Sequence, residues 1–167
     1  AELAPRARRI ALLLDPQWAG VQSTRQYAAA AAQAKGLVLD VVTVVSEADV
    51  QAAFAHLGKE RVDGLVVAPT PGTIKLGSEI RRGALGLRLP VVGFVHQGAV
   101  AEYNQDFADQ WRQSADFIDA IFRGADPAEL PLRQSTRFVL SVNLPAAQAI
   151  GLKLPQAILL RADKVIE

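Results

Sequence analysis

The chain has 167 residues, of which 50% are hydrophobic and 21% are charged, a balance that suits one compact domain and excludes a disordered chain. Its formal net charge is +1 and its Lys and Arg residues are scattered, which argues against a nucleic-acid partner. Cysteine is absent, so neither a disulfide framework nor a thiolate site can form.

Apolar runs alternate with longer helical patterns over residues 1–104, which predicts repeated βα units. The first strand is expected from Arg9 to Asp15, because a nearly continuous apolar run is typical of a central strand buried on both faces. An Ala-rich helix from Gly20 to Lys35 follows and ends at Gly36. Leu37 to Val45 is the second predicted strand.

The second helix has the clearest beginning in the sequence. Ser46 to Asp49 has the pattern of a capping box, in which the first and last side chains each accept a bond from the other's backbone N–H. Helical spacing then places Val50, Phe54 and Leu57 on one side, which predicts a buried face.

Three further strands complete the predicted sheet, from Asp63 to Pro69, Pro90 to Phe94 and Ala99 to Tyr103. A turn at residues 70–73 and a helix of weaker pattern separate the first two, since that helix contains Gly77, Gly83 and Gly86. Because βαβ crossovers are right-handed, we expect a three-layer α/β/α sandwich with a mostly parallel five-stranded sheet in the order 2-1-3-4-5. The carboxyl ends of its strands would form one ligand crevice.

The carboxyl-terminal part differs in character. Residues Asp106 to Arg123 form a strongly amphipathic helix that stops at Gly124. A turn-rich connector from Asp126 to Pro131 leads to a further candidate strand at residues 137–143, then a short helix and a candidate final strand. The apolar stripe of the long helix is wide, and its members are Phe107, Trp111, Ala115, Ile118 and Phe122.

Several α/β chemistries are excluded by the residues that come after particular strands. Residues 15–20 read DPQWAG, where a dinucleotide site needs G-x-G-x-x-G, and no Gly-Lys-Ser/Thr phosphate loop is present. A phosphate-receiver domain needs an Asp and a Lys after its third and fourth strands, where this chain has Ala68-Pro69 and residues 95–97 of sequence VHQ. No His, Asp and Glu cluster has metal-site spacing. The sequence therefore predicts no cofactor, no metal and no catalytic residue, so the protein is not expected to be an enzyme.

Polar and aromatic side chains follow strands one, three and four. Donors, acceptors and an aromatic wall together suit a small polar molecule with an apolar part. The alternatives are a solvated loop rim and, for the indole, inward packing in the core. The predicted ligand-binding residues are Asp15, Gln17, Trp18, Thr70, Thr73, His96 and Gln97.

His96 is the histidine at a predicted strand end, where ligand contact and a solvated loop are both open and catalysis lacks a partner. His56 lies on the second predicted helix and is expected at the surface. Tyr103 and Asn104 either close the crevice or precede the long helix, with Asn104 or Asp106 as its N-cap.

The sequence permits a periplasmic location and does not establish it. No apolar stretch approaches the roughly 18 to 20 residues that span a bilayer. The opening Ala-Glu-Leu-Ala-Pro fits a mature end left by signal-peptide cleavage, and it fits a trimmed chain equally well. A periplasmic protein whose signal peptide has been removed is the expectation that the first of these explanations gives.

Segments along the whole chain resemble the ABC transporter substrate-binding protein family that includes tryptophan-binding lipoproteins. They are RIALLLDPQWAG, RVDGLVVAPTPGTI, LPVVGF and, most specifically, the succession of RGADPAELP, FVLSVNLPAAQAIGLKLP and LLRADKVIE. The resemblance implies one lobe, the carboxyl-terminal one, of a type I periplasmic binding protein, in which two lobes close on an amino acid or a related metabolite. It also implies that the loops after strands one, three and four contact the ligand.

Two departures from the family pattern matter. Family members often have Asn-Pro where this chain has Asp15-Pro16; an anion there either favours an amine-bearing ligand or caps a turn. The match starts with the second lobe, so an excised lobe and a half-length relative are both open. In the family the long helix crosses to the other lobe, and an exposed stripe predicts a partner. We therefore expect a homodimer in which the Phe107 to Phe122 helix packs on, or is exchanged with, a second copy.

The sequence thus predicts residues 1–167 to be a single binding-protein lobe, with core βα units at 1–104 and a helical extension at 105–167 near a dimer interface. The first functional hypothesis is an extracytoplasmic component that binds a small, amino-acid-like molecule for an ABC permease. The alternative is a ligand-sensing or interaction module with a periplasmic signalling partner.

Overall fold

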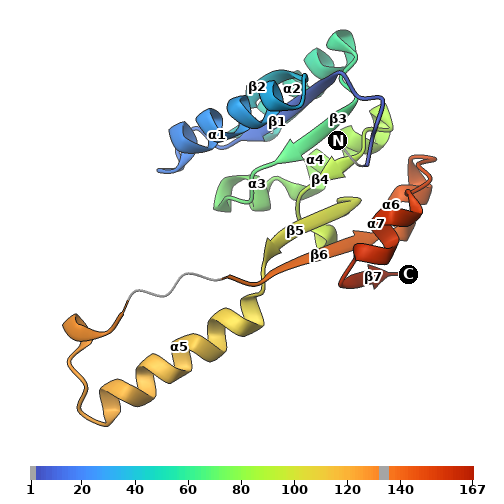
Figure 1. The fold of residues 1–167 in the computed structure, drawn as a ribbon. Helices are drawn as coiled ribbons and strands as arrows, with labels where there is room; N and C mark the ends of the chain where they lie inside the picture. The colour runs from blue at the N-terminus through green and yellow to red at the C-terminus, as the bar shows by residue number, and fades with distance from the viewer. Residues whose placement is uncertain (1–2, 132–135) are drawn as a thin grey trace.

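The structure is a computed structural model, which describes residues 3–131 and 136–167 (Figure 1). Ala1 and Glu2, which belong to the suggested mature end, lie outside the described residues. The strands are β1 Arg9–Leu14, β2 Val38–Thr43, β3 Gly64–Val67, β4 Val91–Val92, β5 Ala101–Gln105, β6 Phe138–Asn143 and β7 Lys164–Ile166. The helices are α1 Val21–Ala34, α2 Glu47–Glu60, α3 Pro71–Lys75, α4 Gly77–Leu87, α5 Phe107–Phe122, α6 Leu144–Ala149 and α7 Gln156–Arg161, with short 3-10 helices η1 Val95–Gln97 and η2 Pro127–Glu129.

The strands form one sheet in the order β2-β1-β3-β4-β5-β6-β7. Neighbouring strands are parallel except β5 and β6, which are antiparallel. The predicted order of the first five strands and the mostly parallel α/β architecture are confirmed. The sheet is larger than the five strands predicted, because residues 138–143 and 164–166 extend it at the β5 edge.

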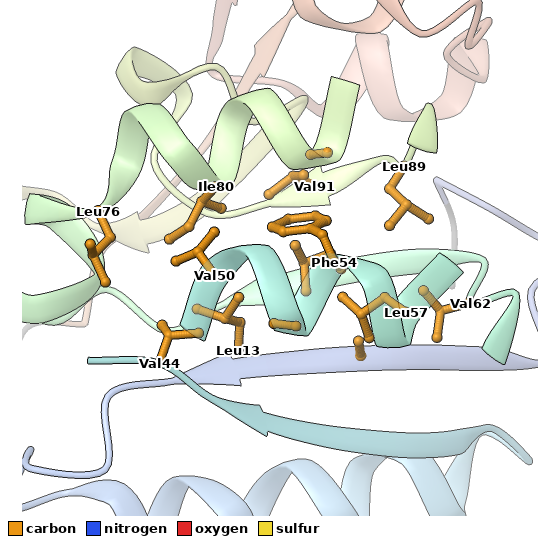
Figure 2. Close-up of a cluster of buried hydrophobic side chains, with 14 of the residues drawn as sticks. Leu13, Val44, Val50, Phe54, Leu57, Val62, Leu76, Ile80, Leu89 and Val91 are labelled. Carbon is orange, nitrogen blue, oxygen red and sulfur yellow. The ribbon is translucent and has the colours of Figure 1, made fainter. Parts of the chain in front are cut away.

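One face of the sheet is covered by α2 and α4 (Figure 2). The capping box at Ser46 and Asp49 begins α2, and Val50, Phe54 and Leu57 are buried, as predicted. They pack against Leu13 and Leu65 of the sheet and against Ile80 of α4. A Cβ added at Gly83 would overlap the Phe54 ring, so the glycine that weakens the helical pattern lets the two helices approach closely.

The opposite face is covered in part by α1. Leu12, Leu14 and Ala68 form a small buried cluster against which Val21 and Ala28 of α1 pack. A third cluster joins Ala101 and Val142, neighbours on β5 and β6, to Ala147 of α6 and Ile158 of α7. The hydrophobic core is therefore three clusters arranged along the sheet.

Left-handed residues end several helices. Gly36 and Gly124 have φ values of 65° and 96°, which agrees with their prediction as helix terminators. The helices α2 and α4 end instead at Arg61 and Arg88, both with φ 52°, where no glycine marks the end in the sequence.

The long helix α5 stands apart from the rest (Figure 1). The Asp106 side chain accepts a hydrogen bond from the Asp109 backbone N–H, so Asp106, and not Asn104, is the N-cap. None of its 16 residues is buried. Trp111 is 74% exposed and Phe122 is 85% exposed. The amphipathic pattern thus predicts the helix correctly, and its apolar stripe faces solvent.

Candidate functional site

The loop after β1 and the turn after β3 meet at the carboxyl-terminal edge of the sheet. The Asp15 carboxylate accepts a hydrogen bond from the Gln17 backbone N–H at 2.8 Å. It also lies so close to Gly72 that a Cβ there would overlap it. Asp15 therefore caps its own turn, one of the two roles left open by the sequence, while remaining half-buried beside α3.

Thr70 and Thr73 are almost completely buried, at 0% and 1% exposed. They form a capping box at the start of α3, in which each backbone N–H donates to the other's hydroxyl oxygen. The Thr73 hydroxyl also donates to the Ala68 carbonyl at 2.6 Å. Residues 70–73, expected as a turn, are therefore the N-cap and first turn of α3, and both hydroxyls are bonded within it.

Gln97 connects the β4 loop to the same helix. Its side-chain amide donates to the Ile74 carbonyl at 3.0 Å, and the amide packs where a Cβ on Gly77 would overlap it. His96, next to it, is exposed, and its ring lies 5.0 Å from the Phe94 ring in a tilted arrangement. Gln97 is thus fixed by this bond at the carboxyl-terminal edge of the sheet, whereas the His96 side chain is exposed to solvent.

Trp18 is 38% exposed, so it does not belong to the buried core. Its indole lies over Gly20, where a Cβ would overlap the ring. It borders an open hollow of about 430 Å³, which we call the trough. The floor of the trough is formed by three side chains that lie in register on adjacent strands, Leu12, Val66 and Val92. Its sides are lined by Trp18, by Thr24 and Tyr27 of α1, and by Tyr103 and Asn104 of β5.

A half-buried carboxylate helps to hold the loop after β4. Glu102 accepts hydrogen bonds from the Val95 backbone N–H at 3.1 Å and from the Asn104 side-chain amide at 3.3 Å. The Asn143 amide donates to the Val95 carbonyl at 3.1 Å. Sequence reasoning missed Glu102 and Asn143, although a carboxylate inside the apolar run Ala99 to Tyr103 signals a specific partner.

The predicted residues therefore share one edge of the sheet without sharing one cavity. Asp15, the Thr70–Thr73 turn and Gln97 meet around α3, whereas Trp18 borders the trough. His96 borders a separate hollow of about 200 Å³ with Asn143. Tyr103 and Asn104, proposed to close the crevice, line the trough side. Among the described residues, no group of three or more His, Cys, Asp or Glu residues is placed to hold a metal ion.

The sequence model of the ABC transporter substrate-binding protein family matches residues 1–166. The chain belongs to this family. Its members bind substrates and do not transform them, which confirms the prediction of a non-enzymatic protein at the level of the family. No curated protein matched the sequence. Within the described residues, no helix is long and apolar enough to cross a membrane.

Solved structures agree with the family assignment. A conserved domain protein from Vibrio cholerae is 26% identical, with a TM-score of 0.87 over 98% of this chain and 56% of that one. A domain from Streptococcus pneumoniae in complex with L-Trp is 20% identical, with a TM-score of 0.85 over 99% and 58%. A ligand-free, open substrate-binding protein with adhesive properties from Clostridium difficile is 16% identical, with a TM-score of 0.74 over 98% and 56%. The chain therefore spans little more than half the length of these structures.

Proposed function

We propose that this lobe is the small-molecule binding component of an extracytoplasmic receptor linked to an ABC permease, with the ligand held at the carboxyl-terminal edge of the sheet. The family match carries this proposal. The edge supports it, because Asp15, Trp18 and Gln97 come from two different loops and are each fitted against a glycine. Such close packing restricts side chains before a ligand arrives, which lowers the entropy cost of binding.

An amino-acid-like ligand is the chemistry that these side chains suit best. The half-buried Asp15 carboxylate would pair with an ammonium group in addition to capping its turn, and Trp18 would offer an aromatic surface to an apolar side chain. The Streptococcus pneumoniae neighbour contains L-Trp, an ammonium-bearing aromatic molecule. His96 and Gln97 would contribute from the β4 side, and Thr70 and Thr73 would act by shaping the turn that faces Asp15.

A thermal-shift screen of the 167-residue chain with the individual L-amino acids tests this proposal. A compound that binds the folded state alone raises the midpoint, by an amount equivalent to about 2.7 kcal/mol at a concentration one hundred times its Kd. Asp15→Asn should weaken the effect of ammonium-bearing compounds, whereas N-acetylated versions of the same compounds should have little effect on either protein. If no amino acid shifts the midpoint of the wild-type chain, the ligand class is wrong.

Self-association through α5 is the other part of the proposal, and it defines the roles of the two segments. Residues 1–104 would carry the ligand edge, and residues 105–167 would bring two copies together as a homodimer. The exposed aromatic stripe of α5 supports this, since apolar patches of that kind mark interaction surfaces. The same stripe favours a second candidate function, a ligand-sensing or interaction module with a periplasmic signalling partner. A neighbouring permease and ATPase gene pair would favour transport, and a neighbouring sensor kinase would favour signalling.

A further inference from the structure

The hollow of about 200 Å³ beside His96 is lined by α4, by η1 and by α6, with Asn143 at the end of β6. Its volume is that of about seven water molecules at roughly 30 Å³ each, which suits a small ion or metabolite. The charged or titratable side chains that line it are Arg81 and His96, and no carboxylate lines it. The hollow therefore has an excess of positive charge and of hydrogen-bond donors.

The stem of Arg81 is packed against the end of η1. A Cβ added at Gly98 would lie 2.8 Å from the Arg81 Cδ and 3.0 Å from its Nε, so the glycine allows this contact. The φ of 89° at Gly98 is also in the left-handed region that favours glycine. Among the described residues, Arg81 forms no ion pair and no hydrogen bond, whereas Arg82 next to it pairs with Glu79 at 3.7 Å. The Arg81 guanidinium thus keeps all its N–H donors for another partner.

His96 supplies a second donor to the same hollow. Its exposed ring lies beside the Phe94 ring, with centroids 5.0 Å apart. No carboxylate of the described residues pairs with it, whereas the Nε2 of the other histidine, His56, lies 2.8 Å from the Asp40 carboxylate. An anion in the hollow would stabilise the charged form of the imidazole, and a cation would oppose it.

Asn143 fixes two walls of the hollow relative to one another. Its side-chain oxygen accepts a hydrogen bond from the Ala146 N–H at 2.9 Å, at the start of α6. Its side-chain amide donates to the Val95 carbonyl at 3.1 Å, in η1. The Glu102 carboxylate, which accepts from the Val95 N–H, borders other hollows and does not line this one. The positive lining is therefore held in place without a carboxylate that would neutralise it.

We infer that this hollow binds a small oxyanion, such as sulfate, phosphate or the carboxylate of a metabolite, through the Arg81 guanidinium with His96 as a second donor. A planar guanidinium pairs with two oxygens of such an anion at once, which favours oxyanions over chloride. The inference goes beyond the proposed function, because Asp15, Trp18 and Gln97 do not line this hollow.

A sulfate titration followed by NMR of the isotope-labelled chain tests the site residue by residue. Sulfate replaces chloride at constant ionic strength, so that general screening stays the same. We expect the backbone signals of Arg81, His96 and Gly98 and the ring signals of His96 to move and to saturate with one common Kd. The chain contains two histidines, and the ring signals of His56 should stay in place as an internal control. Acetate, with a single charge, should move the same signals with a weaker Kd.

Substitutions on α4 separate a specific site from general attraction to positive charge. Arg81→Gln should weaken sulfate binding about tenfold or more, because the bidentate charged pair is lost. Arg82→Gln removes the same charge from a position outside the lining and should change the Kd less than about twofold. Arg81→Lys keeps the stem and the charge and should give an intermediate loss, which separates loss of the fork from misfolding.

The role of His96 is tested by pH, since sulfate keeps its charge while histidine titrates. Sulfate should bind more tightly at about pH 5.5 than at about pH 8, because His96 is the lining group that gains positive charge over that range. His96→Gln should abolish the difference. Equal affinity of the wild-type chain at both pH values would remove His96 from the site.

Three results would overturn the oxyanion site itself. They are no movement of the Arg81 and His96 signals, movement without saturation, and equal losses in Arg81→Gln and Arg82→Gln. The thermal-shift response to amino acids should be the same in Arg81→Gln as in the wild-type chain, because Arg81 lies outside the predicted ligand edge. Failure of the oxyanion site is thereby distinguished from failure of the proposed function.

Discussion

Replacement of Thr73 by valine tests the claim that the buried turn after β3 is held by its two threonine hydroxyls. The substitution preserves side-chain shape and removes the hydroxyl that donates to the Ala68 carbonyl at 2.6 Å and accepts from the Thr70 N–H at 3.0 Å. The Thr70 N–H also donates to the Ala68 carbonyl at 3.0 Å, so neither backbone group loses every partner. Loss of one N-terminal box bond and one buried side-chain bond should therefore cost about 1–2 kcal/mol.

Urea unfolding followed by circular dichroism measures this loss. With a slope of roughly 2 kcal/mol/M, the midpoint should fall by about 0.5–1 M with the slope unchanged. Thr73→Ser, which retains the hydroxyl, should recover most of the hydrogen-bond contribution, and the exposed Thr136→Val should change little. A Thr73→Val midpoint within about 0.2 M of wild type would refute the assignment of the hydroxyl to the turn.

Three other substitutions probe the edge, the core and the start of the sheet. Gly20→Ala should displace the Trp18 indole and lower ligand affinity several-fold by calorimetry with little change in stability; unchanged affinity would remove Trp18 from the site. Phe54→Ala should cost about 3–5 kcal/mol in urea unfolding, and a loss below about 1 kcal/mol would contradict its place in the core. Backbone N–H groups of Arg9 and Arg8 donate to the Asp63 carboxylate and lower its pKa, so this contribution to stability is present above the ordinary Asp value of about 4 and is lost as the pH falls through the lowered pKa. Asp63→Asn should therefore lose stability relative to wild type at neutral pH, with the gap closing under acid; a gap that widens in acid would contradict this assignment.

The sequence predicted the fold correctly where local chemistry and burial favour the same element. The apolar run at β1, the capping box at Ser46 and the stop at Gly36 each predict the element that is observed, because each signal is local. The end of α2 at Arg61 was not readable, since a left-handed Arg depends on the packing around it. The helical pattern of α4 is weak for the same reason, that it depends on tertiary packing. Gly83 is required there because a Cβ would overlap the Phe54 ring of α2.

The sequence predicted which residues lie at the candidate site better than it predicted how they are arranged there. Strand ends located Asp15, Trp18 and Gln97 at one edge, because parallel strands end on the same side. The sequence did not predict the trough, because the trough depends on which part of β3 and β4 the helices leave uncovered. The bond from the Val95 N–H to Glu102 was also missed, because pairing between a loop and a neighbouring strand leaves no spacing in the sequence.

The most direct test of ligand binding at the sheet edge uses Trp18 as its own reporter. The chain contains two tryptophans, so Trp111→Phe leaves Trp18 as the sole indole. Amino acids without an indole that raise the thermal midpoint are titrated while its fluorescence is recorded. Binding beside Trp18 predicts a saturable change in emission with the Kd found by calorimetry. A ligand that stabilises the protein and binds by calorimetry while Trp18 emission stays constant would place the site elsewhere and contradict the account.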